Sequence, residues 1–65
     1  MNLSTRKITF TFHRADGSVT KTTKEMFGDN DMVQWATQQY AEVNECGVTA
    51  HINDQQIAIY GNVQN

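Results

Sequence analysis

The sequence predicts an α+β domain in which one helix covers one face of a four-stranded sheet, with the elements in the order β-β-α-β-β. Two strand-like segments separated by a turn precede residue 25, and two more follow residue 47. The segment between these pairs has apolar residues at helical spacing. A chain of 65 residues has room for one small domain, so we expect a single domain over 1–65, with an ordered core at about 6–60 and a frayed tail at 61–65.

The first hairpin is predicted from an alternating strand and a tight turn. Residues 6–13 alternate polar side chains with three apolar ones, Ile8, Phe10 and Phe12, which is typical of a half-buried strand. Asp16-Gly17 favours a two-residue loop, because glycine accepts the positive φ angle that a type I′ turn requires. That loop would place Val19 on the face of the phenylalanines and make residues 19–24 a weakly apolar edge strand.

The helix is predicted at about residues 31–45. Asp29 and its neighbours place carboxylates where they cap free N–H groups and suit the positive end of the helix dipole. The predicted core stripe has i, i+3, i+4 spacing and consists of Val33, Ala36, Tyr40 and Val43. Trp35 flanks this stripe and is expected at the core or its rim. Gly47 is expected to end the helix in the left-handed conformation that glycine tolerates.

The second hairpin is predicted from two further alternating segments, residues 48–52 and 56–60, around a tight turn at Asn53-Asp54. In the register of a two-residue loop, four apolar residues share the helix-facing side, namely Val48, Ala50, Ile57 and Ile59. Tyr60 then belongs to the opposite face. A right-handed crossover between the hairpins would set the first and last strands side by side and parallel, which gives a mixed sheet of the β-grasp type.

The end of the predicted helix resembles the small immunoglobulin-binding domains of streptococcal protein G. The resemblance covers the stretch 39–48, in which Gln-Tyr-Ala is followed by Asn44 and Gly47. Those domains have the β-grasp architecture, so the resemblance implies this fold and carries no implication for function. The final strand at 58–60 departs from that family, because it lacks the threonine-rich character of their last strand.

Charge is divided unevenly along the chain. The first 24 residues hold all five bases against one acid, which gives them a charge of +4, and residues 25–65 hold six acids and no base. One interpretation is that a basic hairpin binds a nucleic-acid backbone or an acidic protein surface through Lys7, Arg14, Lys21 and Lys24. The other is that these side chains are solvated ends and edge guards, in keeping with a net charge of −2.

Two further surfaces are candidates for binding a partner. The sheet face away from the helix is expected to carry several threonines with His13, His51 and Tyr60, the tyrosine serving as an aromatic anchor. The outer side of the helix offers a second set, Trp35, Gln38 and Glu42. Each surface is alternatively an ordinary solvated face, and the sheet face or an edge strand also offers a route to a homodimer.

The composition argues against an enzyme and against a bound cofactor or metal. The single cysteine, Cys46, excludes an intrachain disulfide, and its spacing from His13 and His51 matches no zinc pattern. The four glycines are isolated, so the sequence contains no phosphate-binding loop. No apolar stretch is long enough to cross a membrane and the N-terminus has no signal-peptide pattern, so we expect a cytoplasmic protein.

These observations lead to a small non-enzymatic protein-interaction module, which would be a regulator, inhibitor or adaptor of the kind found among bacterial and phage accessory proteins. The alternative hypothesis is a nucleic-acid-binding domain that uses the basic hairpin and the open sheet face. Under the first hypothesis the partner is another protein, and a homodimer is a third hypothesis.

Overall fold

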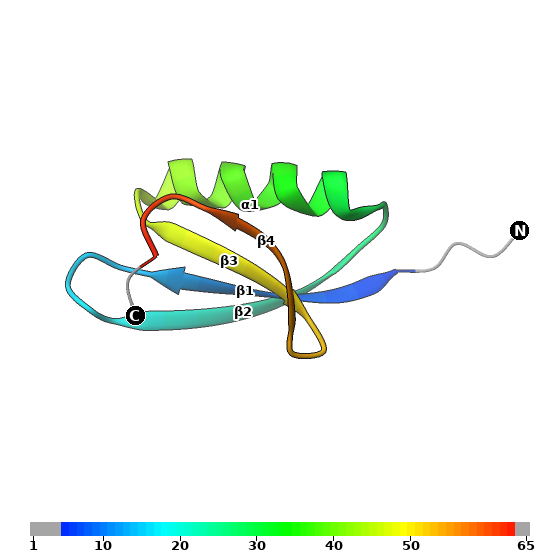
Figure 1. Ribbon diagram of the computed structural model, residues 1–65, viewed down its shortest axis with the longest axis horizontal. Coiled ribbons are helices and arrows are strands. Elements are labelled where there is room, and N and C mark those ends of the chain that lie inside the picture. Colours follow the sequence, from blue (N-terminus) through cyan, green and yellow to red (C-terminus); the bar gives the residue numbers. More distant parts are fainter. Residues whose placement is uncertain (1–4, 64–65) are drawn as a thin grey trace, which may run out of the picture.

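The computed structural model describes residues 5–63, which form a four-stranded sheet with one helix packed on one face (Figure 1). In chain order the elements are β1 (Arg6–His13), β2 (Val19–Met26), α1 (Asn30–Asn44), β3 (Gly47–Ile52) and β4 (Gln55–Tyr60). The predicted α+β class and the order of its elements are therefore confirmed.

The sheet is antiparallel throughout, with the strand order β2-β1-β3-β4. The expected mixed sheet of the β-grasp type is therefore wrong, because β3 rather than β4 lies beside β1. The prediction placed the last strand beside the first because a right-handed crossover between the hairpins would bring them together. The centre is instead filled by the small residues of β3, since every residue from Gly47 to Ala50 is buried, whereas Ile59 of β4 is exposed.

The first hairpin has a longer loop than the predicted two residues. The N–H of Gly17 donates to the carbonyl of Arg14, and the N–H of Arg14 donates to the carbonyl of Ser18, which is a turn followed by a bulge at a glycine with φ of 91°. The bulge moves the register by one residue, so His13 faces Val19. Val19 consequently lies on the face away from the phenylalanines, and it is 55% exposed.

A side chain supports this loop from within. Oδ1 of Asp16 accepts hydrogen bonds from the hydroxyl of Ser18 at 2.7 Å and from its backbone N–H at 2.9 Å. These bonds favour the ionised carboxylate, so they lower the pKa of Asp16 below its ordinary value. The turn is therefore best ordered when this carboxylate is charged.

The core lies between β1, β3 and the inner side of α1. Ile8, Phe10 and Phe12 of β1 are buried beneath the helix, as the alternation predicts. Tyr40 of α1 packs edge-on against two of them, with ring centroids 4.9 Å from Phe10 and 5.7 Å from Phe12. This aromatic cluster joins the helix to the central strand.

The buried side of α1 differs from the predicted stripe. Thr37 is fully buried, and its hydroxyl donates to the carbonyl of Val33 at 2.7 Å, which satisfies its polar atom inside the core. Val43 was predicted in the core and is 79% exposed, and Trp35 was expected at the core or its rim and is 61% exposed. The core side of the helix is thus rotated toward Thr37 and Ala41, and the tryptophan lies outside it.

The second hairpin also departs from the predicted register. The β3–β4 pairing shifts between Ala50 and His51, so Ala50 faces Ala58. From this point the faces of β4 are reversed relative to the prediction. Tyr60 pairs with the buried Val48 and lies on the helix side, whereas Ile59 lies on the open face of the sheet.

Helix α1 begins as predicted and ends differently. Oδ1 of Asp29 accepts from the N–H of Met32 at 3.1 Å, which is an N-cap. At the other end the left-handed residue is Glu45, with φ of 52° and ψ of 47°, and not Gly47. A glutamate in this conformation is strained, and its charge lies at the negative end of the helix dipole.

Replacing Glu45 with glycine is therefore expected to stabilise the protein by about 0.5–1 kcal/mol. Relief of about 1–2 kcal/mol of left-handed strain outweighs the added flexibility of the unfolded chain. The matched control is Glu42→Gly, which places the same glycine within the helix and should cost about 1 kcal/mol. Thermal unfolding followed by circular dichroism distinguishes the two, and a lower melting temperature for Glu45→Gly would contradict this account.

The C-terminal segment runs back along the start of β3. A Cβ atom on Gly47 would overlap the backbone carbonyl of Asn62 and reach within 3.0 Å of Cγ2 of Val63. Residues 61–63 of the predicted frayed tail therefore lie directly against the sheet, and residues 64 and 65 lie outside the described part of the chain.

Candidate protein-binding surfaces

The outer side of α1 carries an exposed apolar stripe. Met32, Trp35 and Val43 are all exposed, and with Gln39 they follow the three- and four-residue spacing that aligns side chains on one face of a helix. Met32 and Trp35 are one turn apart, and the half-buried Gln39 lies between Trp35 and Val43. Exposed large apolar side chains gathered on one face are typical of a protein-interaction site. The predicted neighbours flank this stripe, with Glu42 exposed and Gln38 half-buried.

The basic residues of the first hairpin do not gather into one patch. Lys7 and Lys21 lie on the open face of the sheet, but Lys24 faces Ile8 and so lies on the helix side. Arg14 lies at the hairpin end, with its guanidinium carbon 5.9 Å from the centroid of the Phe12 ring.

The side chain of Arg6 connects β1 to the start of α1. Its guanidinium donates to the carbonyl of Gly28 at 2.7 Å and to Oδ1 of Asn30 at 3.0 Å. These bonds tie the end of β1 to the segment that starts α1. Of the five bases, this one serves the fold at the helix start rather than a free basic surface.

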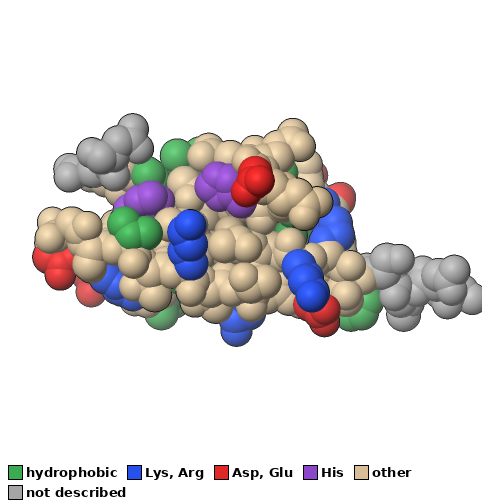
Figure 2. Space-filling model, turned by 90° about the horizontal axis from the view of Figure 1, so that it is seen from below, with side chains coloured by type: hydrophobic (Ala, Val, Ile, Leu, Met, Phe, Trp, Pro, Cys, Tyr) green, Lys and Arg blue, Asp and Glu red, His purple; other side chains and the backbone are tan. Residues whose placement is uncertain are grey.

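The open face of the sheet is mainly polar, and Figure 2 shows histidine and lysine side chains on it among other polar groups and backbone. Nε2 of His13 lies 3.3 Å from the hydroxyl oxygen of Thr49, and its Nδ1 is buried without a partner among the described residues. His51 lies on the same face, opposite Thr9. The predicted aromatic anchor, Tyr60, is on the other side of the sheet, which removes the stacking group from the nucleic-acid hypothesis.

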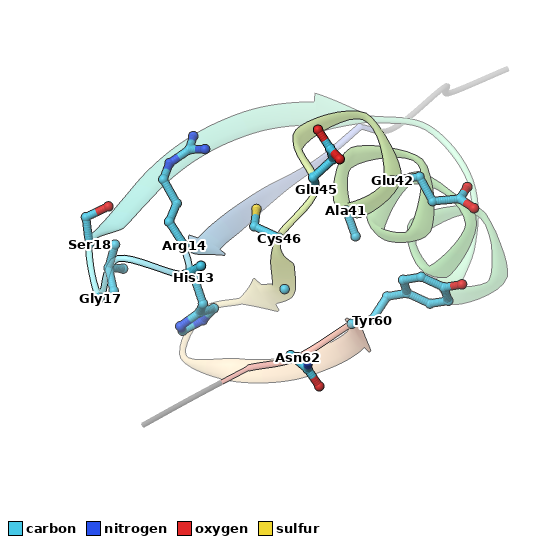
Figure 3. Close-up of a pocket in the computed structure, with 14 residues that line it drawn as sticks. His13, Arg14, Gly17, Ser18, Ala41, Glu42, Glu45, Cys46, Tyr60 and Asn62 are labelled. Carbon is cyan, nitrogen blue, oxygen red and sulfur yellow. The ribbon is translucent and has the colours of Figure 1, made fainter.

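A cavity of about 500 Å³ lies between the first hairpin, the C-terminal end of α1 and the end of β4 (Figure 3). It brings together side chains from both predicted sets, which are His13, Arg14, Glu42 and Tyr60. Cys46 and Val19 contribute apolar wall. The sequence offered no signal for this cavity, because it depends on the reversed face of Tyr60 and on the hairpin extending past the helix (Figure 1).

Within residues 5–63, no three side chains among His, Cys, Asp and Glu lie close enough together to hold a metal ion. No helix in the described part of the chain is long and apolar enough to cross a membrane.

A small α+β domain whose most exposed aromatic side chain lies on the outer side of its one helix defines a protein-interaction module. The chain belongs to the family Dmd, discriminator of mRNA degradation, whose model matches residues 4–60. Family membership confirms the predicted class, a small interaction regulator of the phage type.

Three matches to two related phage proteins support this assignment. The antitoxin Dmd of Enterobacteria phage T4 is 54% identical over 35 residues, and this match spans 54% of the chain and 58% of that protein. The crystal structure of Dmd from phage RB69 is similar, with a TM-score of 0.82 and 32% identity over 88% of this chain and 92% of that one. The T4 antitoxin in complex with the Escherichia coli toxin LsoA gives a TM-score of 0.67 and 40% identity, over 85% and 93%.

Proposed function

We propose that this protein is an antitoxin that inhibits a bacterial toxin of the LsoA kind by binding it, without chemistry of its own. The proposal is supported by the family and by the T4 relative, which was crystallised in complex with that toxin. The observation that carries it in this chain is Trp35, which is 61% exposed on the outer side of α1. The free, half-buried thiol of Cys46 suits a reducing compartment, so we place this activity in the cytoplasm.

The stripe around Trp35 has the composition of an interaction hot spot. A large aromatic side chain at the centre of an apolar stripe gives most of the binding energy in many interfaces. The helix and its caps carry Asp29, Asp31, Glu42 and Glu45 and no base. The matching surface of the toxin should therefore be basic around an apolar pocket.

Replacing Trp35 with alanine should weaken binding to LsoA by about 2 kcal/mol or more, which is about a 30-fold increase in Kd. The fold should survive because most of this side chain is exposed. Titration calorimetry with purified toxin measures the change. The matched control is Ile59→Thr, which alters an exposed apolar side chain on the open sheet face and should leave the Kd unchanged.

The reverse outcome would refute this surface. Unchanged affinity for Trp35→Ala together with a loss for Ile59→Thr would move the toxin to the sheet face. No measurable binding by the unaltered chain would remove LsoA as the partner.

A further inference from the structure

The two edges of the sheet differ in how far they are open. At β4 the helix lies over the edge strand (Figure 1), and the side chain of Gln34 donates to the carbonyl of Ile59 at 3.2 Å. At β2 every residue except Met26 is exposed. An exposed edge of this length is a template for pairing with another strand. The remaining question is which strand it fits.

The hairpin hydrogen bonds fix which backbone groups of β2 point outward. The bond from the N–H of Arg14 to the carbonyl of Ser18 sets the hydrogen-bonded positions of the β1–β2 ladder. In an antiparallel pair these positions alternate. With the observed register, Thr20, Thr22 and Lys24 bond to β1, and the N–H and C=O groups of the odd-numbered residues Val19, Lys21, Thr23 and Glu25 point to the free edge.

We propose that two copies of this chain pair through β2, antiparallel about a two-fold axis at Thr23, which joins their sheets into one. In this register Thr23 faces its own symmetry mate, and Lys21 of each copy faces Glu25 of the other. The Thr23–Thr23 and Lys21–Glu25 pairs both use residues whose backbone groups point to the free edge. Their side chains lie on the open face, because Thr23 and Lys21 are paired with Thr9 and Thr11 of β1, which also lie on that face. Opposite charges directly across an antiparallel pair stabilise it.

The neighbouring registers lack this complementarity. An axis at Lys21 or at Lys24 would place two lysines directly opposite each other, and like charges there destabilise the pair. An axis at Thr22 would leave Lys21 opposite a threonine. The lysines thus disfavour two of these registers, and the axis at Thr23 is favoured because it pairs Lys21 with Glu25.

The ends of the proposed interface are apolar. Continuing the register beyond the charged pairs sets Val19 opposite Phe27 of the second copy, at both ends. In the single chain these side chains are 55% and 57% exposed; Val19 is the first residue of β2 and Phe27 follows its last residue. Pairing therefore shields two apolar groups that the monomer leaves in water. It also leaves Trp35 on the outer side of α1 accessible, so the dimer does not depend on the proposed toxin binding.

The test is a charge exchange across the axis. Sedimentation equilibrium over a range of concentrations should give a mass of two chains for the unaltered protein. Lys21→Glu alone and Glu25→Lys alone each bring like charges together and should give one chain, an about twofold lower mass. The double variant K21E/E25K restores opposite pairs and should return to two chains.

Three results would overturn the proposal. These are one chain for the unaltered protein at every concentration, two chains for both single variants, or one chain for the double variant. Circular dichroism confirms that each variant is folded, which the exposure of both side chains favours.

A cross-link gives a second, independent measurement in a Cys46→Ser background. Thr23→Cys lies on the proposed axis, where opposing Cα atoms of a hydrogen-bonded pair are about 5.5 Å apart, within reach of a disulfide. Thr22→Cys is the matched control, since it faces Lys24 of the second copy rather than itself. A linked dimer of Thr23→Cys alone supports the axis, and equal linking of both variants, or of neither, refutes it.

Discussion

Replacing Phe10 with alanine is expected to remove a large part of the protein's free energy of unfolding. Phe10 is fully buried at the middle of β1, and its ring packs edge-on against Tyr40 at 4.9 Å. Such a truncation in a core costs about 3–5 kcal/mol, from lost burial and from the cavity it leaves. A domain of this length has a total stability of about 3–10 kcal/mol. Urea unfolding followed by circular dichroism measures the loss.

The same substitution at an exposed ring is the control. Phe27 is 57% exposed outside the core, so Phe27→Ala should change the stability by less than about 0.5 kcal/mol when measured at low protein concentration. Equal losses for the two variants would mean that the aromatic cluster does not hold the helix to the sheet.

The positions of the elements could be predicted because their signals are local. A strand is indicated by the alternation within residues 6–13, and a helix start is indicated by an N-cap aspartate. Both patterns span only a few residues, and Asp29 does accept from the N–H of Met32 as expected. Strand order has no such signal. The crossover rule suggested a central last strand, but β3 lies beside β1, and its residues from Gly47 to Ala50 are all buried.

The registers failed for one physical reason at each hairpin. A bulge adds a residue to one strand, and a shift of one residue reverses every face beyond it. The bulge at Gly17 moved Val19 to the open face, and the irregularity at Ala50/His51 moved Tyr60 to the helix side. Asp-Gly favours the two-residue loop that was predicted, but a longer loop with a bulge at the glycine is also common and is the one that forms here.

The sequence placed Trp35 in two ways, at the core or its rim and in a candidate binding set with Gln38 and Glu42. Counting only apolar residues aligned the helix on Val33, Ala36, Tyr40 and Val43 and brought Trp35 close to the core. Thr37 is nevertheless fully buried, because its hydroxyl bonds within the helix to Val33. When Thr37 is counted as a core residue, the buried side of the helix is centred farther from Trp35. The tryptophan then belongs to the exposed outer stripe.

The close contact at Gly47 has a second consequence, because it determines where the C-terminal segment can lie. A Cβ at this position would overlap the carbonyl group of Asn62, which is backbone and cannot rotate away. Gly61 follows the end of β4 with φ of 84° and passes close to Gly47 and Cys46. The segment and the start of β3 thus approach each other as closely as two backbones without side chains allow.

Gly47→Ala is therefore expected to displace residues 61–63 from the sheet and to cost about 1–3 kcal/mol, the usual range for overpacking. The amide signals of 61–63 should shift and exchange faster with solvent. Gly17→Ala separates this effect from glycine flexibility, because Gly17 has open space around it and is constrained only by φ of 91°. That control should lower stability while leaving the signals of 61–63 in place, and unchanged signals in Gly47→Ala would refute the contact. Gly61 and Asn62 line the cavity beside α1, so the same variant should also change the shape of that cavity. The absence of a side chain at Gly47 therefore determines both the path of residues 61–63 and the shape of the cavity next to the proposed toxin-binding helix.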